Sequence, residues 1–312
     1  MPTYNDATAL IERQLSLINV PSKGRYYEGG KSYFLIRHLS SIEENILAND
    51  ALMETEEGIK LVLRSLMVDD FDIEMLLPGD VQAISMFLYS TAYGDKIEMD
   101  VTCPSCSLKE KKDVHISSFK MKEIERWPDE GRVLDGVLPV SKLEFQMRIP
   151  TFFDEFRFKR ELNNGDSHLD RISLLLSGIG DIRDRHQIRS FIEGLPIQDS
   201  RYLRKFIEKN TPGVDTHVDH ECTECHQEYK VHVSSGHNFL RLPESYVSSI
   251  LEEVYLVAKH GENISWEAAS RMSTSQRKWV LQRISQDNKK RNEQDSKEAS
   301  KLKTKTRSFK RR

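Results

Sequence analysis

The chain has 312 residues, 38% of them hydrophobic and 30% charged, and a formal net charge of −3. No apolar run approaches the ~20 residues of a membrane-spanning helix, and the first residues do not read as a signal peptide, so membrane-embedded and secreted classes are not expected. Residues 289–312 hold eleven Lys and Arg against three Asp and Glu, a local charge of +8 that leaves −11 on the remainder. An acidic body with a basic tail is not the composition of a general nucleic-acid-binding protein.

The first 120 residues predict an N-terminal segment and a first α/β region. In residues 1–30 we expect a helix at 7–19, because apolar residues recur at helical spacing, followed by a turn-rich stretch that contains Pro21 and three glycines. For residues 31–120, the expected elements are a strand at 33–37, a helix to about residue 49, and helices at 56–68 and 81–93. Two overlapping capping boxes are open for the first of these helices, Ser40 with Glu43 and Ser41 with Glu44, and the turn at Leu77–Asp80 offers Asp80 as the N-cap of the last one.

This first region ends in a C-x-x-C motif formed by Cys103 and Cys106. Apolar residues alternate with polar ones before the motif, and the alternation resumes after it at Val114 and Ile116. A strand, a C-x-x-C turn and a second strand together predict a zinc knuckle over residues 96–118.

Residues 121–236 predict an irregular connector and a second α/β region. Prolines and glycines interrupt residues 121–141, which favours a connector without regular structure. For residues 142–236, the expected elements are a strand at 143–149, a helix capped by Thr151 and Asp154, helices near 168–177 and 185–193, and a helix that follows Asp199. A second predicted knuckle, with Cys222 and Cys225, completes this region over residues 214–235.

The two regions share one order of elements, which predicts a tandem repeat of about 90 residues. Each has a strand that ends in Arg, a capped helix, further helices, a Leu-Pro turn with a following Asp, one more helix and a knuckle. Pro78 precedes Cys103 by 25 residues, and Pro196 precedes Cys222 by 26. The alternative is that two ordinary α/β segments resemble each other by chance.

The four cysteines are the only ones in the chain, and they predict a single structural zinc ion. Two C-x-x-C motifs supply the four thiolates of a tetrahedral site, and a separation of 119 residues between Cys103 and Cys222 means that the metal joins distant parts of the chain. We therefore expect an α+β fold in which two repeats pair around one tetrathiolate zinc.

Three other interpretations of the cysteines were considered. A redox C-x-x-C usually begins a helix, which neither pair does, and a disulfide suits a secreted chain. Histidines near the second motif could replace a thiolate, although exposed or strand-pairing roles are more common. These histidines are His217, His220, His226 and His232.

The C-terminal part predicts helices followed by a disordered extension. Residues 237–286 contain amphipathic segments near 243–259, 265 and 273, whereas apolar residues almost vanish in residues 287–312. A segment of this composition does not bury enough apolar surface to fold by itself, so we expect a basic tail that is either disordered or a frayed helix.

Several stretches resemble the small baseplate proteins of T-even-type contractile-tailed bacteriophages, the baseplate hub and hub-assembly group. The similarity spans residues 15–285 loosely and residues 20–118 best. The stretches that carry it are Pro21–Tyr27, Phe34–Glu44, Phe71–Cys106 and Tyr255–Arg283 with Trp266, Met272 and Trp279. The chain has Ser273 where the family pattern leads us to expect proline, and the basic tail has no counterpart in it.

The resemblance implies a structural or assembly role in the baseplate, with other hub or tail proteins as partners, in the host cytoplasm during assembly and in the virion tail. It implies no catalysis, and the sequence contains no phosphate-binding loop, nucleophile elbow or H-E-x-x-H motif. A zinc-containing nucleic-acid-binding or regulatory protein is the alternative, favoured by the basic tail and opposed by the acidic remainder.

Overall fold

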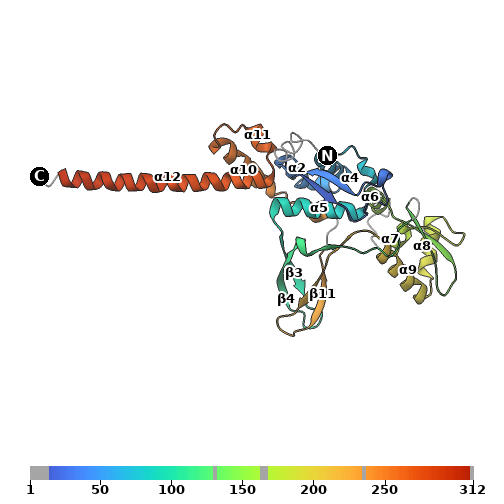
Figure 1. Ribbon diagram of the computed structural model, residues 1–312. Coiled ribbons are helices and arrows are strands. Elements are labelled where there is room, and N and C mark those ends of the chain that lie inside the picture. Colours follow the sequence, from blue (N-terminus) through green and yellow to red (C-terminus); the bar gives the residue numbers. More distant parts are fainter. Residues whose placement is uncertain (1–13, 129–131, 162–167, 234–236, 310–312) are drawn as a thin grey trace. The chain divides into compact units, whose positions relative to one another are not determined.

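The computed structural model describes residues 14–128, 132–161, 168–233 and 237–309. The chain divides into two compact units, each assembled from separated segments (Figure 1). Unit 1 comprises Met1–His38 and Ala51–Arg241, and unit 2 comprises Leu39–Asp50 and Leu242–Arg312. None of the described helices is both long enough and apolar enough to span a membrane.

The first half of unit 1 is a two-stranded sheet with helices. Its elements are β1 (Leu15–Asn19), β2 (Tyr33–Arg37), α3 (Asp50–Met53, shared with unit 2), α4 (Glu56–Leu66) and α5 (Pro78–Tyr93), with 3₁₀ turns η1 (Glu28–Gly30) and η2 (Ile73–Met75). The predicted strand at 33–37 and the helices near 56–68 and 81–93 are confirmed.

The predicted helix at 7–19 is wrong where the structure describes it. Residues 15–19 form β1, which pairs antiparallel with β2, and residues 7–13 lie outside the described residues. A short apolar run fits either a helix or a strand, so the available partner strand decides. The side chains follow the two-residue period of a strand, with Leu17 exposed and Ile18 buried.

Two buried aspartates hold the turns that precede β2 and β7 (Glu144–Arg148). The Asp80 carboxylate accepts the backbone N–H of Ser22 at 2.9 Å and the hydroxyl of Tyr27. Asp80 lies inside α5, which begins at Pro78, so the predicted N-cap role of Asp80 is wrong. Asp199 of α9 (Ile197–Asn210) makes similar bonds, accepting the N–H groups of Val140 at 2.7 Å and Ser141 at 2.9 Å and the hydroxyl of Ser141.

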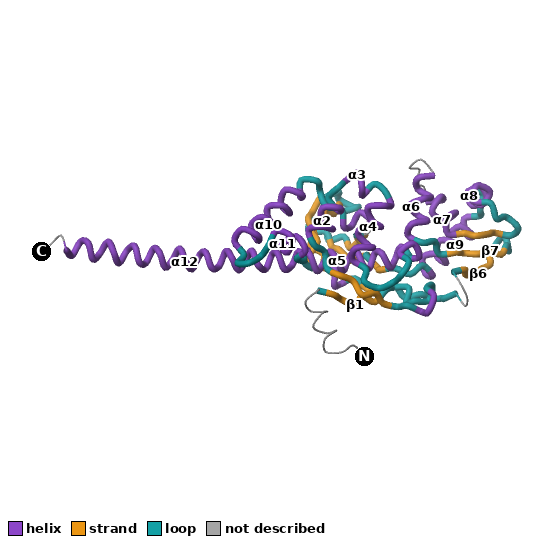
Figure 2. The backbone as a smooth tube through the Cα atoms, turned by 90° about the horizontal axis from the view of Figure 1, so that it is seen from above, coloured by secondary structure: helices purple, strands orange, loops and turns teal. Residues whose placement is uncertain are grey.

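The second half of unit 1 contains a three-stranded antiparallel sheet with helices beside it (Figure 2). The strand order is β6-β7-β8. Its elements are β5 (Lys120–Met121), β6 (Val133–Val137), β7, α6 (Phe152–Glu161), α7 (His168–Leu175), β8 (Leu176–Ile179), α8 (Arg185–Glu193) and α9 (Ile197–Asn210). Thr151 and Asp154 cap α6 reciprocally, as predicted, with bonds of 3.0 and 3.1 Å.

The expectation of an irregular connector over 121–141 is wrong at residues 133–137, which form β6. Gly136 concealed this strand because glycine usually marks a turn. The ring of Phe145 on β7 lies against Gly136, and a Cβ at that position would come within 2.3 Å of the ring. Only glycine therefore allows the two strands to pair around this buried ring.

Unit 2 packs one short helix from early in the chain against the C-terminal helices. Its elements are α2 (Ser41–Leu47), α10 (Tyr246–His260), α11 (Trp266–Arg271) and α12 (Thr274–Phe309). Of the two capping boxes that the sequence allows, the one between Ser40 and Glu43 forms at the start of α2. Val254, Val257 and Ala269 form the apolar centre.

A buried ion pair crosses the centre of unit 2. Arg277 of α12 is fully buried and donates to the carboxylate of Glu44, which is also fully buried, and to Glu253 at 3.3 Å. The backbone N–H of Thr274 donates to the C=O of Leu39 at 2.8 Å. Residues 39–50 thus belong with the C-terminal helices, and not with the first α/β region in which the sequence analysis placed them.

Of the two alternatives for the tail, disorder is wrong for residues 287–309, which continue α12 as a helix. The prediction took the loss of apolar residues as a loss of order. This segment has no glycine or proline and contains eight Lys and Arg residues, which favour helix even without a buried face.

Candidate metal centre

Two β-hairpins carry the four cysteines, and both hairpins project from the region of α5 (Figure 1). The first pairs β3 (Lys96–Thr102) with β4 (Lys109–His115), and the second pairs β10 (His217–Glu221) with β11 (Glu228–His232). Both pairings are antiparallel, and each C-x-x-C motif lies in the turn between the strands.

An apolar cluster and a short strand pair support the bases of the hairpins. β5 pairs with β9 (Val214–Asp215), so the chain leaving the first hairpin is bonded to the chain entering the second. The cluster consists of Met86, Ile116 and Val214, with Ala83, Tyr89, Ile97, Phe119 and Phe239 packed against them. Both hairpins therefore begin from one supported base, which favours contact between their tips.

The two C-x-x-C turns have the same backbone geometry. In the first turn the N–H of Ser107 donates to the C=O of Cys103 at 3.0 Å, and in the second the N–H of His226 donates to the C=O of Cys222 at 3.1 Å. The residue after the second cysteine is left-handed in both, with φ of 62° at Ser107 and 55° at His226. This conformation bends each turn back so that both of its sulfur atoms face one point.

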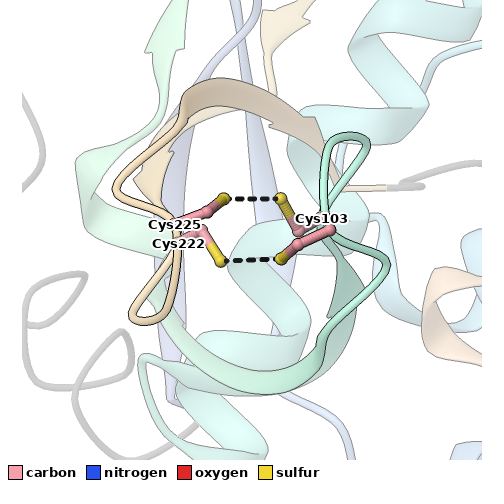
Figure 3. Close-up of side chains that lie close together, drawn as sticks. Cys103, Cys222 and Cys225 are labelled. Carbon is pink, nitrogen blue, oxygen red and sulfur yellow. Dashed lines mark hydrogen bonds between the residues drawn. The ribbon is translucent and has the colours of Figure 1, made fainter.

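The turns meet with all four sulfur atoms close together (Figure 3). The Sγ atoms of Cys103 and Cys225 lie 3.6 Å apart, those of Cys106 and Cys222 lie 3.5 Å apart, and all four lie within 4.8 Å of one another. Cys103 and Cys222 are buried, whereas Cys106 and Cys225 are exposed. The structure thus brings together all four predicted ligands.

The distances fit a tetrathiolate metal ion and exclude a disulfide. With Zn–S bonds of about 2.3 Å, sulfur atoms at the corners of a tetrahedron lie about 3.8 Å apart. A disulfide requires about 2.05 Å, far shorter than the separations of 3.5 and 3.6 Å. Neither motif begins a helix, so the environment of a redox C-x-x-C is absent at these two turns.

Backbone donors favour the thiolate form of Cys103. The N–H of Cys106 lowers the pKa of the Cys103 thiol to about 7, burial acts against it, and the N–H of Ser105, 3.4 Å from Sγ, adds to the lowering. For Cys106 and Cys225 the N–H groups of Leu108 and Gln227 act in the same direction, but burial and the neighbouring thiols outweigh them and raise the pKa, so the backbone donors favour one thiolate of the group.

Polar contacts outside the cysteines join the hairpins. The Glu110 carboxylate accepts the N–H of Thr223 at 3.3 Å, the Thr223 hydroxyl and the Nε2–H of His220 at 3.2 Å. The ammonium group of Lys112 donates to the C=O of Asp219. Glu110 and Lys112 could not be recognised as contact residues from the sequence. The alternation of β4 does not show that their partners on the second hairpin lie more than 100 residues away.

The four histidines near the second motif have other partners. His220 uses Nε2 toward Glu110 and has Nδ1 3.4 Å from the Lys112 ammonium, and Nδ1 of His226 lies 2.8 Å from Glu221. His217 and His232 face each other across β10 and β11. Within the described residues, the group of three or more potential metal ligands that lie together consists of the four cysteines and includes no histidine.

Comparison with known proteins gives one family. The sequence profile of the family described as T4 bacteriophage base plate protein matches residues 36–241. The match includes both C-x-x-C turns and ends at Arg241, the last residue of unit 1. No curated protein and no solved structure matches the chain.

Proposed function

Because the chain belongs to the T4 bacteriophage base plate protein family, we propose that it is a hub subunit or hub assembly factor of a contractile phage tail. It acts through contacts with other baseplate proteins, in the host cytoplasm during assembly and at the tail baseplate. The family match over both hairpins is the observation that carries this proposal.

The metal in this proposal is one structural Zn²⁺ held by Cys103, Cys106, Cys222 and Cys225. Four thiolates at these distances suit zinc, which is commonly bound by four cysteines in tetrahedral geometry. Four protein ligands leave no position for water or substrate, so the centre in this proposal is structural and not catalytic.

The finer architecture in this proposal is a pair of diverged repeats, each ending in one zinc knuckle. The matched bonds of Asp80 and Asp199 support it, as do the left-handed residues that follow Ser22 and Ser141, namely Lys23 with φ of 50° and Lys142 with φ of 58°. The N-caps also correspond, since Ser40 and Thr151 each lie three residues after the arginine that ends a strand.

A pseudo-twofold axis through the metal accounts for the pattern of sulfur contacts. A twofold that exchanges the hairpins exchanges Cys103 with Cys222 and Cys106 with Cys225, so the contact of Cys103 with Cys225 becomes that of Cys222 with Cys106. The two separations, 3.6 and 3.5 Å, agree with this exchange, as does the matched burial of the first cysteine in each pair.

The experiment is complementation of a phage that lacks this protein. Cys103→Ser and Cys222→Ser are each expected to abolish hub assembly and copurification of hub proteins, because either leaves three ligands on one ion. Ser105→Ala, in the same turn but with no ligand atom, serves as the matched control and should assemble normally. Full assembly by both cysteine variants would contradict the proposed role of the metal.

A nucleic-acid-binding role is the second candidate, and the charge of +8 in residues 289–312 favours it. Much of that segment lies on α12, so its positive charge is displayed along a helix. Binding of duplex DNA that weakens steeply with salt, and that is lost on deletion of these residues, would favour this candidate over the baseplate role.

A further inference from the structure

The second hairpin carries a pair of exposed histidines that the cysteine centre does not use. His217 of β10 and His232 of β11 are direct cross-strand partners, and their ring centres lie 5.1 Å apart. Both side chains are exposed. They occupy the end of the hairpin away from the C-x-x-C turn, five residues before Cys222 and seven after Cys225.

The strand register brings these two side chains as close as a sheet allows. The N–H of Val233 donates to the C=O of Thr216 at 3.0 Å, so these two residues form a hydrogen-bonded pair. The next pair, His217 with His232, is therefore of the non-hydrogen-bonded kind, in which opposite side chains approach most closely. Two imidazoles on one tetrahedral ion, with metal–nitrogen bonds of about 2.0–2.1 Å, have ring centres roughly 5 Å apart.

A carboxylate fixes the tautomer of one ring. Oδ1 of Asp215 lies 2.8 Å from Nδ1 of His217 and also accepts the backbone N–H of His217 at 3.1 Å. A carboxylate accepts from an N–H, so Nδ1 carries the proton and the lone pair is on Nε2. Histidine ligands of metals usually have this arrangement, in which a carboxylate holds the nitrogen that does not bind the metal.

We propose that His217 and His232 form a second, exposed metal site that binds one divalent transition cation, such as Ni²⁺ or Zn²⁺, through two imidazole nitrogens, with Asp215 as the positioning residue. Imidazole is a ligand that both ions accept readily. Two protein ligands leave open positions that water fills in the isolated chain, so this site is weaker than the cysteine centre and open to an outside ligand. The inference does not depend on the baseplate assignment.

Lys122 is the charged group that opposes a cation here. Its positive charge acts on Asp215 and on His232, whereas the Asp215 carboxylate compensates for it. Replacing this ammonium group by a neutral polar group should strengthen binding, because like charges near a site disfavour the cation. Lys122→Gln is therefore a gain-of-affinity variant.

The test is calorimetric titration of Ni²⁺ into untagged, full-length protein already loaded with zinc. One Ni²⁺ per chain is expected to bind. His217→Asn and His232→Asn should each remove this binding, and Asp215→Asn should weaken it by about 10–100-fold, as is typical when the partner of a ligating histidine is lost. Lys122→Gln should bind Ni²⁺ more tightly than the unaltered chain.

His226→Asn is the matched control, since His226 is an exposed histidine of the same hairpin region that is paired with Glu221 instead. It should bind Ni²⁺ as the unaltered protein does. Unchanged zinc content in every variant shows that the hairpins still fold. The proposal is overturned if the unaltered protein does not bind Ni²⁺. It is also overturned if the His217→Asn and His232→Asn variants bind Ni²⁺ as tightly as the unaltered protein does.

Discussion

The two units join distant parts of the chain by different chemistry. In unit 1, hairpins whose cysteines are 119 residues apart meet at four sulfur atoms. In unit 2, α2 and α12 meet at the fully buried pair of Glu44 and Arg277, 233 residues apart. The hairpins meet at four cysteines that can hold a metal ion, whereas unit 2 contains its own apolar centre and a buried ion pair. The two units should therefore fail under different treatments.

Metal removal should have the largest effect, and it should be confined to unit 1. A strong zinc chelator is expected to unfold the two hairpins, because binding of structural zinc is worth on the order of 10 kcal/mol in small zinc domains. Amide hydrogen exchange of β3, β4, β10 and β11 measures the loss. In a Trp127→Phe background, which removes the tryptophan of unit 1, the fluorescence of Trp266 and Trp279, both in unit 2, is the internal control and should not change. Loss of this fluorescence at the same chelator concentration would show that the two units do not fail separately.

Removal of Arg277 should have the next largest effect, now confined to unit 2. Arg277→Met leaves the Glu44 carboxylate buried without its partner, which typically costs about 3–5 kcal/mol. Arg283→Met on the same helix is the control, since Arg283 pairs with Asp287 at the surface and such pairs contribute less than about 1 kcal/mol. Denaturant unfolding followed by tryptophan fluorescence measures both variants.

Adding Glu44→Met to Arg277→Met tests whether the buried Glu44 carboxylate causes the loss of stability. Replacing a buried ion pair by apolar side chains is often neutral, so the double variant should recover much of the lost stability. A double variant as unstable as the single one would indicate that Arg277 stabilises unit 2 by packing alone.

Asp80 and Asp199 allow a comparison within unit 1, because their pKa values shift in opposite directions. Burial raises the pKa of Asp80, although bonds from Ser22 and Tyr27 oppose it. For Asp199 burial acts in the same direction, but bonds from Ser141 and Val140 outweigh it and lower the pKa. Ionised Asp199 therefore contributes stability above its unfolded pKa, and this is lost as the pH falls through its folded pKa. Ionised Asp80 opposes folding, and acidification relieves that cost.

The opposite directions of the two pKa shifts predict different profiles of melting temperature against pH for two matched variants. Asp199→Asn should lower the melting temperature at pH 7, and the difference from the unaltered protein should shrink as the pH falls below about 4, the usual range of Asp. Asp80→Asn should show the opposite trend and a smaller effect at pH 7. Parallel profiles of melting temperature against pH would contradict the assignment.

Deleting residues 289–312 should have the smallest effect. The deletion removes a polar part of α12 and almost no apolar surface, so the melting temperature should stay nearly unchanged. Scanning calorimetry of the shortened and full chains measures this. A large drop would show that this part of α12 packs against the rest of the protein.

The candidate metal centre could be predicted from the sequence because the two cysteines of each pair are close together in the chain. Cys103 and Cys106, like Cys222 and Cys225, have the spacing of metal ligands, and four cysteines allow few other uses. Capping residues such as Ser40 and Thr151 were equally local signals. The starts of α2 and α6 were therefore predicted correctly, since a cap and its helix lie within four residues of each other.

The ion pair of Glu44 and Arg277 could not be predicted, because neither residue has a neighbour in sequence that marks it as buried. The strand β6 was missed because Gly136 is explained only by the Phe145 ring on another strand. β1 was missed because its apolar run suits a helix equally well, and pairing with β2 decided it. In each case the deciding partner is distant in sequence.

Zinc content tests the central claim most directly, which is that two distant C-x-x-C turns share one ion. Elemental analysis of the purified protein should give about one zinc per chain by the four-ligand rule. Cys103→Ser and Cys222→Ser should lose zinc and stability equally, and the double variant should be little worse than either, because both act on one site. Two zinc ions per chain, or a Cys103→Ser variant that keeps its zinc while Cys222→Ser loses it, would contradict the shared centre.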